Sequence, residues 1–244
     1  MFPKIRIVLV QTFHPGNIGS AARAMKTMGL ERLYLVNPVR FPDPEATRMA
    51  AGAADLLEKA VVTDQLARAV SDCHLVMGAS ARLRNQPLIE LTPRQLGKEV
   101  AGPYQHQEVA LVFGRERTGL HNDELAYCTH QVAIPGNPDY SILNLAQAVQ
   151  VLGYEIFQAH LEAAPRAAAS RDYPDQEAVQ GFEQHLARAL AASGMLHGGS
   201  PKTLERLCKV FRRARPDVQE LGLLRSLVGR LEKQGKALQK SSSH

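Results

Sequence analysis

Short segments that are apolar on both faces recur along the first two-thirds of this 244-residue chain, and a segment with helical periodicity follows most of them. Residues 5–10 and 109–113 are nearly continuous apolar runs of this kind. Such runs suit strands covered on both faces of a parallel sheet, because a strand with one wet face would alternate apolar and polar residues. Strands that alternate with helices predict an α/β domain with a mostly parallel sheet and helices on both of its faces.

The positions of these elements follow from the pattern. The expected strands are residues 5–10, 33–36, 61–62, 75–78, 109–113 and 131–134. Helical patterns begin near residues 17, 50, 64, 93 and 143, and the last of them is a long apolar helix that runs to residue 161.

The composition changes near residue 164. Residues 164–175 are rich in Ala, Pro and Arg, which is typical of a linker, and only helical patterns follow them. We therefore expect a domain of residues 1–163, a linker of residues 164–175 and a small all-helical domain of residues 176–244.

The charge follows the same division. Residues 1–163 carry 15 Lys and Arg against 16 Asp and Glu, whereas residues 164–244 carry 14 against 8, so the net charges are −1 and +6. A basic appendage on a near-neutral body favours binding of a polyanion, although a solvated basic helix face would have the same composition. Six of these cations gather within 14 residues: Lys202, Arg206, Lys209, Arg212, Arg213 and Arg215. An apolar stripe of Leu204, Leu207, Cys208 and Phe211 would face inward and leave the cations for phosphate contacts.

Several classes of protein are excluded or disfavoured. No apolar run reaches the roughly 18 residues that a membrane-spanning helix needs, and the N-terminus has no leader pattern, so we expect a cytoplasmic protein. Cys73, Cys128 and Cys208 are far apart, and the nine histidines form no HExxH motif. We expect neither a disulfide framework nor a metal site.

Three loops at the expected carboxyl ends of strands hold the residues suited to chemistry. They are residues 14–20, which lead to Arg23, residues 112–120, where Glu116 stands between two arginines, and residues 134–145. Glycines let a backbone approach a ligand closely, and helix N-termini favour anions. Each loop alone would equally suit a surface turn or a capped connection, with Ser141 as the cap in the third. Together they meet where open parallel sheets bind ligands.

The same residues resemble the three motifs of the SPOUT methyltransferases, in the TrmH-like branch. The motifs are Asn17-x2-Ser20-x2-Arg23, Phe113-Gly-Arg-Glu116-x2-Gly119-Leu120, and Ile134-Pro followed by Leu143-Asn144-Leu145. Three motifs in order at the right spacing are far more specific than any one of them. The resemblance covers nearly all of residues 1–161, and the basic segment after Phe211 is similar to a C-terminal extension found in the branch.

The resemblance implies a deep trefoil knot in the C-terminal part of the domain, a homodimer, and S-adenosyl-L-methionine as the cofactor. It implies methylation of a ribose 2′-hydroxyl in tRNA, at cytidine or uridine 32 of the anticodon loop, without a metal. The catalytic residues it implies are Arg23, which would face the hydroxyl, with Asn17, Glu116 and Asn144. The cofactor would contact Ala79, Ser80, Ala81, Gly114, Ile134, Ser141, Ile142, Leu143 and Asn144. RNA would contact Arg82, Arg84, Arg115, Lys202, Arg206, Lys209, Arg212, Arg213 and Arg215.

One position departs from the family pattern. The family has Ser two residues before the motif Asn, whereas this chain has Ile142 there and Ser141 one place earlier. An RNA-binding or assembly factor that kept the fold but lost turnover is therefore a second interpretation. A Rossmann-type dehydrogenase or nucleotide-binding enzyme is a third, against which the missing GxGxxG motif and the basic C-terminal region both argue.

Overall fold

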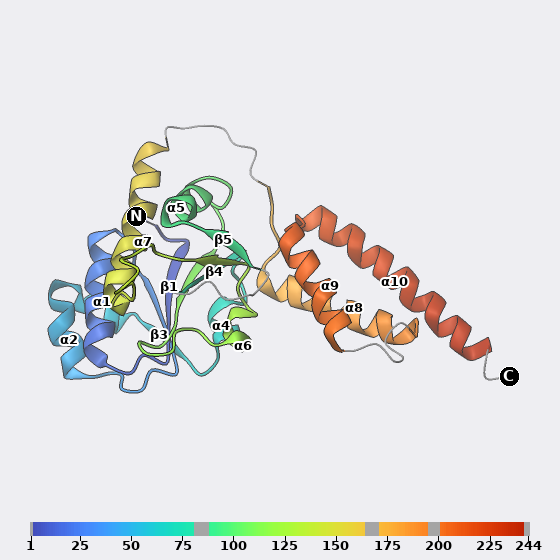
Figure 1. The fold of residues 1–244 in the computed structure, drawn as a ribbon, viewed down its shortest axis with the longest axis horizontal. Coiled ribbons are helices and arrows are strands. Elements are labelled where there is room, and N and C mark those ends of the chain that lie inside the picture. The colour runs from blue at the N-terminus through green and yellow to red at the C-terminus, as the bar shows by residue number, and fades with distance from the viewer. Residues whose placement is uncertain (1, 81–87, 164–170, 195–200, 242–244) are drawn as a thin grey trace. The chain divides into compact units, whose positions relative to one another are not determined.

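The structure is a computed structural model that describes residues 2–80, 88–163, 171–194 and 201–241. It divides into two compact units, Met1–Ser170 and Arg171–His244 (Figure 1). Each unit has a hydrophobic cluster of its own. The predicted linker falls at this division, and its residues 164–170 lie outside the described part of the chain.

All seven described strands of the first unit form one sheet. They are β1 (Ile5–Val10), β2 (Arg32–Val36), β3 (Val61–Thr63), β4 (Leu75–Ala79), β5 (Ile89–Leu91), β6 (Val109–Phe113) and β7 (His130–Val132). Their order in the sheet is β3-β2-β1-β6-β4-β7-β5, and every pairing described is parallel. All carboxyl ends therefore meet at one edge, where the three predicted loops begin. The predicted α/β class is confirmed, while the knot stays a prediction.

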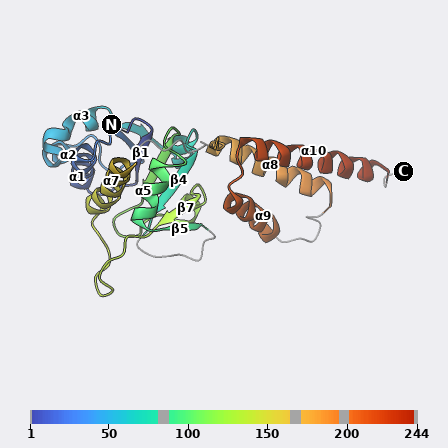
Figure 2. The same ribbon diagram turned by 90° about the horizontal axis from the view of Figure 1, so that it is seen from above.

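Helices cover both faces of this sheet. They are α1 (Pro15–Thr27), α2 (Pro44–Ala50), α3 (Ala54–Glu58), α4 (Leu66–Val70), α5 (Pro93–Ala101), α6 (Asn122–Leu125) and α7 (Leu145–Glu162). Successive residues of a strand point to opposite faces. One face, with Val8 and Val112, packs with Leu66 of α4 and Leu125 of α6. Helix α7 packs against both α1 and α5, and Figures 1 and 2 show it running between them.

The pattern missed the shortest elements. Strand β5 has three residues with Glu90 at its centre, so it forms no apolar run, and helix α6 has four residues, too few for a helical period to show. Helix α2 begins at Pro44, and its N-cap Asp43 accepts a hydrogen bond from the N–H of Glu45 at 2.9 Å. The sequence pattern instead places the start of a helix near residue 50, where the structure has the end of α2, a 3-10 turn (Ala51–Ala53) and α3.

The second unit contains the described helices α8 (Gln176–Ala192), α9 (Pro201–Ala214) and α10 (Val218–Ser241). Its cluster is centred on Phe182 of α8, and the ring of Phe211 from α9 meets it edge-on, with 5.0 Å between ring centroids. The predicted inward stripe of α9, Leu204, Leu207, Cys208 and Phe211, packs against this cluster. No helix of the described chain is both long and apolar enough to cross a bilayer.

A buried arginine joins strands at the amino edge of the sheet. Arg6, in β1, is 1% exposed and donates from Nη1 and Nη2 to the two carboxylate oxygens of Asp72, at 2.8 and 2.7 Å. Its Nη2 also donates to Oε2 of Glu108 at 2.8 Å, and its guanidinium lies 4.6 Å from the centre of the Tyr34 ring. The hydrogen bond from Arg6 lowers the pKa of Asp72. Burial would raise the pKa of Glu108, but hydrogen bonds from Arg6, Arg32 and Lys4 outweigh burial and lower it.

These shifts predict an acid-sensitive fold. Both carboxyls have depressed pKa values in the folded chain, so the unfolded chain takes up protons first as the pH falls. Their contribution to stability is therefore complete above their ordinary pKa values and is lost as the pH drops through the folded ones. We expect the free energy of unfolding to decrease between about pH 5 and pH 2, measured by denaturant titration. Glu108→Gln should cost about 1.5–3 kcal/mol at neutral pH and flatten this pH dependence. A slope unchanged in the variant would contradict the assignment.

Candidate functional site

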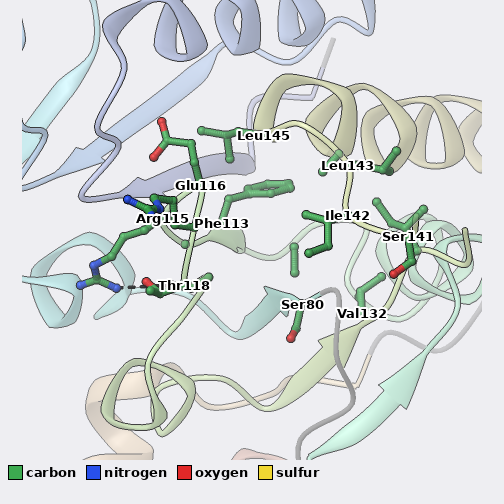
Figure 3. Close-up of a pocket in the computed structure, with 16 residues that line it drawn as sticks. Ser80, Phe113, Arg115, Glu116, Thr118, Val132, Ser141, Ile142, Leu143 and Leu145 are labelled. Atoms are coloured by element: carbon green, nitrogen blue, oxygen red, sulfur yellow. Dashed lines mark hydrogen bonds between the residues drawn. The ribbon is translucent and has the colours of Figure 1, made fainter. Parts of the chain in front are cut away.

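A cavity of about 410 Å³ opens where β4, β6 and β7 end (Figure 3). Its wall is apolar at Phe113, Val132, Ile134 and Leu145, and Ser80 supplies a hydroxyl. The complete lining is Ala79, Ser80, Phe113, Gly114, Arg115, Glu116, Arg117, Thr118, Gly119, Val132, Ile134, Ser141, Ile142, Leu143, Leu145 and Ala148. A cavity of this size with an apolar wall and a few polar groups suits a small organic ligand.

The second predicted loop forms one wall as a tight turn after β6. The N–H of Arg115 donates to the carbonyl of Gly119 at 3.2 Å, and the N–H of Gly119 donates back to the carbonyl of Arg115 at 2.9 Å. Gly119 has φ +67°, in the left-handed region that favours glycine. A Cβ added to Gly114 would lie 2.1 Å from the carbonyl carbon of Gly119, so the turn closes directly on that residue.

The third loop ends at a capped helix. Asn144 is the N-cap of α7, and its side-chain oxygen accepts from the N–H of Ala146 at 2.9 Å. Gln147 returns the contact by accepting from the N–H of Asn144 at 3.1 Å. The alternative interpretation of Ser141 as the cap is therefore wrong, and the helix begins at Leu145 rather than at residue 143. Ile142, at the departure from the family motif, lines the cavity and is 57% exposed.

One chain of hydrogen bonds joins all three loops. Asn144 Nδ2 donates to Asn17 Oδ1 at 3.0 Å, and Asn17 Nδ2 donates to Glu116 Oε1 at 2.8 Å. The carboxylate of Glu116 also accepts from the backbone N–H groups of Phe13 and His14, at 3.0 and 3.1 Å. Burial would raise the pKa of Glu116, but the bonds from Asn17, Phe13 and His14 outweigh burial and lower it. Glu116 is therefore an ionised acceptor at neutral pH that fixes the first loop against the second.

Arg23 lies on α1, the helix that Asn17 opens. Its side chain is exposed, off the buried face formed by Ile18, Ala22 and Met25, as the periodicity predicts. Within the described ranges, no hydrogen bond or ion pair of its guanidinium is seen. The structure therefore brings Asn17, Glu116 and Asn144 into direct contact and leaves Arg23 at the surface of the same loop-helix unit.

The predicted cofactor residues gather round the cavity. Those that line it are Ala79, Ser80, Gly114, Ile134, Ser141, Ile142 and Leu143. Asn144 does not line the cavity but caps the helix beside it. Ala81, Arg82 and Arg84 lie outside the described residues. The sequence analysis did not assign Phe113, Thr118, Val132, Leu145 and Ala148 to the cofactor, although they line the cavity. Phe113, Thr118 and Leu145 stand within the motifs, and Val132 and Ala148 could have been found by extending the third motif along its strand and its helix.

The predicted RNA-binding cations differ in their surroundings. Arg115 forms an ion pair with Glu124 on α6, in which the two side chains are 17% and 12% exposed. On α9, Arg212 donates from Nε and Nη2 to the carboxylate of Glu183 at 2.6 and 2.7 Å, and Lys209 pairs with Glu205 at 2.5 Å. The other predicted cations of α9 are exposed, and they are Lys202, Arg206 and Arg213.

Arg215 shows a fourth environment. Its guanidinium lies 5.2 Å from the centre of the Tyr173 ring, and its backbone has φ +50° just after α9 ends.

The expectation that the whole cation set faces outward needs correction at Arg212, because Glu183 of the neighbouring helix pairs with it at a half-buried position.

The first unit and its site define the class of the protein. Residues 4–154 match the SpoU rRNA Methylase family, and the chain belongs to this family. Residues 177–241, in the second unit, match the C-terminal domain of the tRNA methyltransferase TrmJ. The family resemblance of the three sequence motifs is thereby confirmed.

Three similar proteins illustrate the relationship. The tRNA (cytidine/uridine-2′-O-)-methyltransferase TrmJ of Yersinia pestis (strain Pestoides F) is 48% identical over 248 residues, which cover 99% of this chain and 96% of that protein. The crystal structure of TrmJ from Z. mobilis ZM4 is 31% identical, covers 93% of this chain and 98% of that one, and superposes with a TM-score of 0.78. The SpoU methyltransferase AviRb from Streptomyces viridochromogenes, solved in complex with the cofactor AdoMet, shares the fold at 22% identity and a TM-score of 0.51, over 65% of this chain and 61% of its own.

Proposed function

We propose that this protein transfers a methyl group from S-adenosyl-L-methionine to the ribose 2′-hydroxyl of cytidine or uridine in tRNA, at position 32 of the anticodon loop. The observation that carries the proposal is the contact of Asn17, Glu116 and Asn144 beside a ligand-sized cavity. The 48% identity to a tRNA (cytidine/uridine-2′-O-)-methyltransferase supports the substrate class. A tRNA substrate favours a cytoplasmic location.

The cavity residues fit the cofactor by their chemistry. The apolar wall at Phe113, Ile134 and Leu145 suits the flat face of an adenine ring, and the Ser80 hydroxyl can bond a polar edge. A side chain at Gly114 would push into the turn at Gly119, so the backbone here can approach a ligand closely. When bound, this cofactor would supply the methyl group on a sulfonium.

The chain's own residues would align the hydroxyl. Arg23 would hold the 2′-hydroxyl or the adjacent phosphate through the planar fork of N–H donors on its guanidinium. Asn17 and Asn144 would fix the position of the ribose, since each is already held by a second loop. Glu116, ionised and bonded to the first loop, would keep that loop in place during the reaction. Positioning of this kind is a large part of catalysis for a weak nucleophile.

One assay separates the three interpretations. The protein is incubated with labelled S-adenosyl-L-methionine and either bulk tRNA or a tRNA that carries one 2′-deoxy nucleotide at position 32. We expect label in bulk tRNA, 2′-O-methylated cytidine or uridine by nucleoside mass spectrometry, and none at the deoxy position. Binding of both partners without transfer would instead support an RNA-binding factor, the interpretation that Ile142 favours. Failure to bind the cofactor would support the third interpretation, a Rossmann-type dehydrogenase or nucleotide-binding enzyme.

The basic second unit is expected to supply affinity for tRNA. Truncation after Ala163 should leave cofactor binding largely unchanged, while the dissociation constant for tRNA rises and becomes less dependent on salt. Replacing the exposed Lys202, Arg206 and Arg213 by Ala in the full chain should lower the salt slope by roughly one for each phosphate that is no longer neutralised. Filter binding at salt concentrations between about 50 and 200 mM measures the dissociation constant for tRNA and its dependence on salt. A truncated protein that methylates tRNA at the full rate would show that these helices are only a solvated face.

We further propose that the active species is a homodimer. Helix α7 leaves Tyr154 and Leu161 48% and 61% exposed, which is apolar surface beyond what the sheet covers. Sedimentation equilibrium should give about twice the 26.7 kDa of one chain. Leu161→Lys should shift the protein toward the monomer with a parallel loss of methyl transfer, and a fully active monomer would contradict the proposal.

A further inference from the structure

We infer that Arg115 is a positioning residue that clamps the wall of the cofactor cavity, and not the RNA contact that its charge suggests. The inference rests on the proposed function for the identity of the ligand. The clamp itself consists of Arg115, Gln11, Gly119 and Glu124.

The guanidinium of Arg115 is occupied on almost every side. Nε donates to Gln11 Oε1 at 2.8 Å, Nη1 to Glu124 Oε2 at 3.0 Å and to the carbonyl of Gly119 at 3.4 Å, and Nη2 to Glu124 Oε1 at 2.8 Å. An arginine has about five N–H donors, so these four bonds leave roughly one for any other acceptor. A phosphate would have to displace a bidentate carboxylate to gain more than one bond.

The partners of Arg115 come from three different parts of the first unit. Gln11 stands directly after β1 and has φ +47°, and its N–H donates to the carbonyl of Val36 at 2.8 Å. Glu124 belongs to the short helix α6 and also accepts from the N–H of His121 at 2.7 Å. Gly119 closes the turn that Arg115 itself opens. The clamp therefore holds the turn after β6 against both the end of β1 and α6.

This turn forms one wall of the cavity. Every residue from 115 to 119 lines it, and Glu116 within the turn carries the hydrogen bonds to Asn17 and the first loop. A shift of the turn would move the cavity wall and the carboxylate of Glu116 together. Glu124 does not line the cavity, so an effect of Glu124 on ligand affinity must pass through Arg115 or through α6.

The charge balance supports the same assignment. Arg115 and Glu124 are 17% and 12% exposed, and the pair has no net charge. A half-buried neutral pair attracts a polyanion far less than an exposed cation does, because phosphate affinity depends on uncompensated charge. The exposed Arg213 of α9 has no such carboxylate partner among the described residues.

The test compares Arg115→Lys and Glu124→Gln in the full-length protein. Both break the bidentate pair, but only the second removes a negative charge. We expect each to raise the calorimetric dissociation constant for S-adenosyl-L-methionine by roughly tenfold, a typical cost of losing a charged hydrogen bond. In Arg115→Lys, which keeps the positive charge, the dissociation constant for tRNA and its salt slope, measured without the cofactor, should stay within about twofold. The double variant should bind the cofactor no more weakly than either single variant, since all three lack the same bidentate pair.

Two controls make the outcome specific. Arg94→Lys breaks an exposed pair with Glu162, whose side chains are 69% and 58% exposed, and should change neither affinity. Arg213→Ala should weaken tRNA binding and leave cofactor binding unchanged. If Arg115→Lys or Arg115→Ala weakened tRNA binding like Arg213→Ala, with cofactor affinity intact, Arg115 would be an RNA contact and the inference would be overturned.

A ligand-free measurement separates this inference from the proposed function. Amide hydrogen exchange at Gly119, whose N–H donates within the turn, should be at least about tenfold faster in Arg115→Lys than in the wild type. If the wild type binds no S-adenosyl-L-methionine but this exchange accelerates, the cofactor assignment fails and the clamp stands. Unchanged exchange at Gly119 would reject the clamp whatever the ligand is.

Discussion

Replacement of Arg23 by Ala should slow methyl transfer by about a hundredfold or more in a single turnover with saturating tRNA and cofactor. The reason is that Arg23 would orient the reacting hydroxyl, and loss of a positioned catalytic group has an effect of this size. Cofactor binding by calorimetry should barely change, because Arg23 does not line the cavity. Arg23→Lys should not restore the rate, since a point charge cannot reproduce the planar fork of the guanidinium.

The position of Arg23 separates an effect on the rate of methyl transfer from an effect on folding. Arg23 is exposed on α1, and removal of an exposed side chain changes the free energy of unfolding by no more than about 0.5 kcal/mol. A loss of rate therefore reports on chemistry and not on folding. A normal single-turnover rate in the Ala variant would remove Arg23 from the mechanism and weaken the case for an enzyme.

Gly114→Ala is expected to weaken cofactor binding by about a hundredfold. The new Cβ would stand 2.1 Å from the carbonyl carbon of Gly119 and 2.2 Å from the N of Leu120. Both are backbone atoms, so the turn itself must move, and the free energy of unfolding should fall by about 1–3 kcal/mol.

Gly52→Ala is the matched control for this variant. A Cβ at Gly52 meets nothing within 4 Å, so the same substitution there should change neither cofactor affinity nor stability by a measurable amount. Calorimetry and thermal unfolding of the two variants give the comparison. Wild-type cofactor affinity in Gly114→Ala would show that the ligand lies away from this turn.

The sequence predicted the sheet well because its central strands are long and apolar. Strand β6 was found with the bounds Val109–Phe113, all of whose residues are buried. Strand β5 was missed because its sequence, Ile89-Glu90-Leu91, has a charged residue at the centre and forms no apolar run. The three loops were placed together correctly, since parallel strands end at one edge.

The partners of individual side chains could not be read from the sequence. Arg115 meets Glu124, nine positions later, through the fold of a turn and a four-residue helix. Arg212 of α9 pairs with Glu183 of α8, and their separation in sequence corresponds to no helical or strand period. Charge identifies a cation, but only the packing of neighbouring elements decides whether that cation is available to a ligand.

The order of the strands has a consequence for how the chain is made. β1 pairs on one side with β2, close by in sequence, and on the other with β6, about 100 residues later. A ribosome adds roughly 5–20 residues per second, so one edge of β1 stays without its partner for about 5–20 seconds of synthesis. During that interval the buried strand Ile5–Val10 is an open template for other chains. We therefore expect the yield of folded protein to depend on early protection of this nascent strand more than on the stability of the finished sheet.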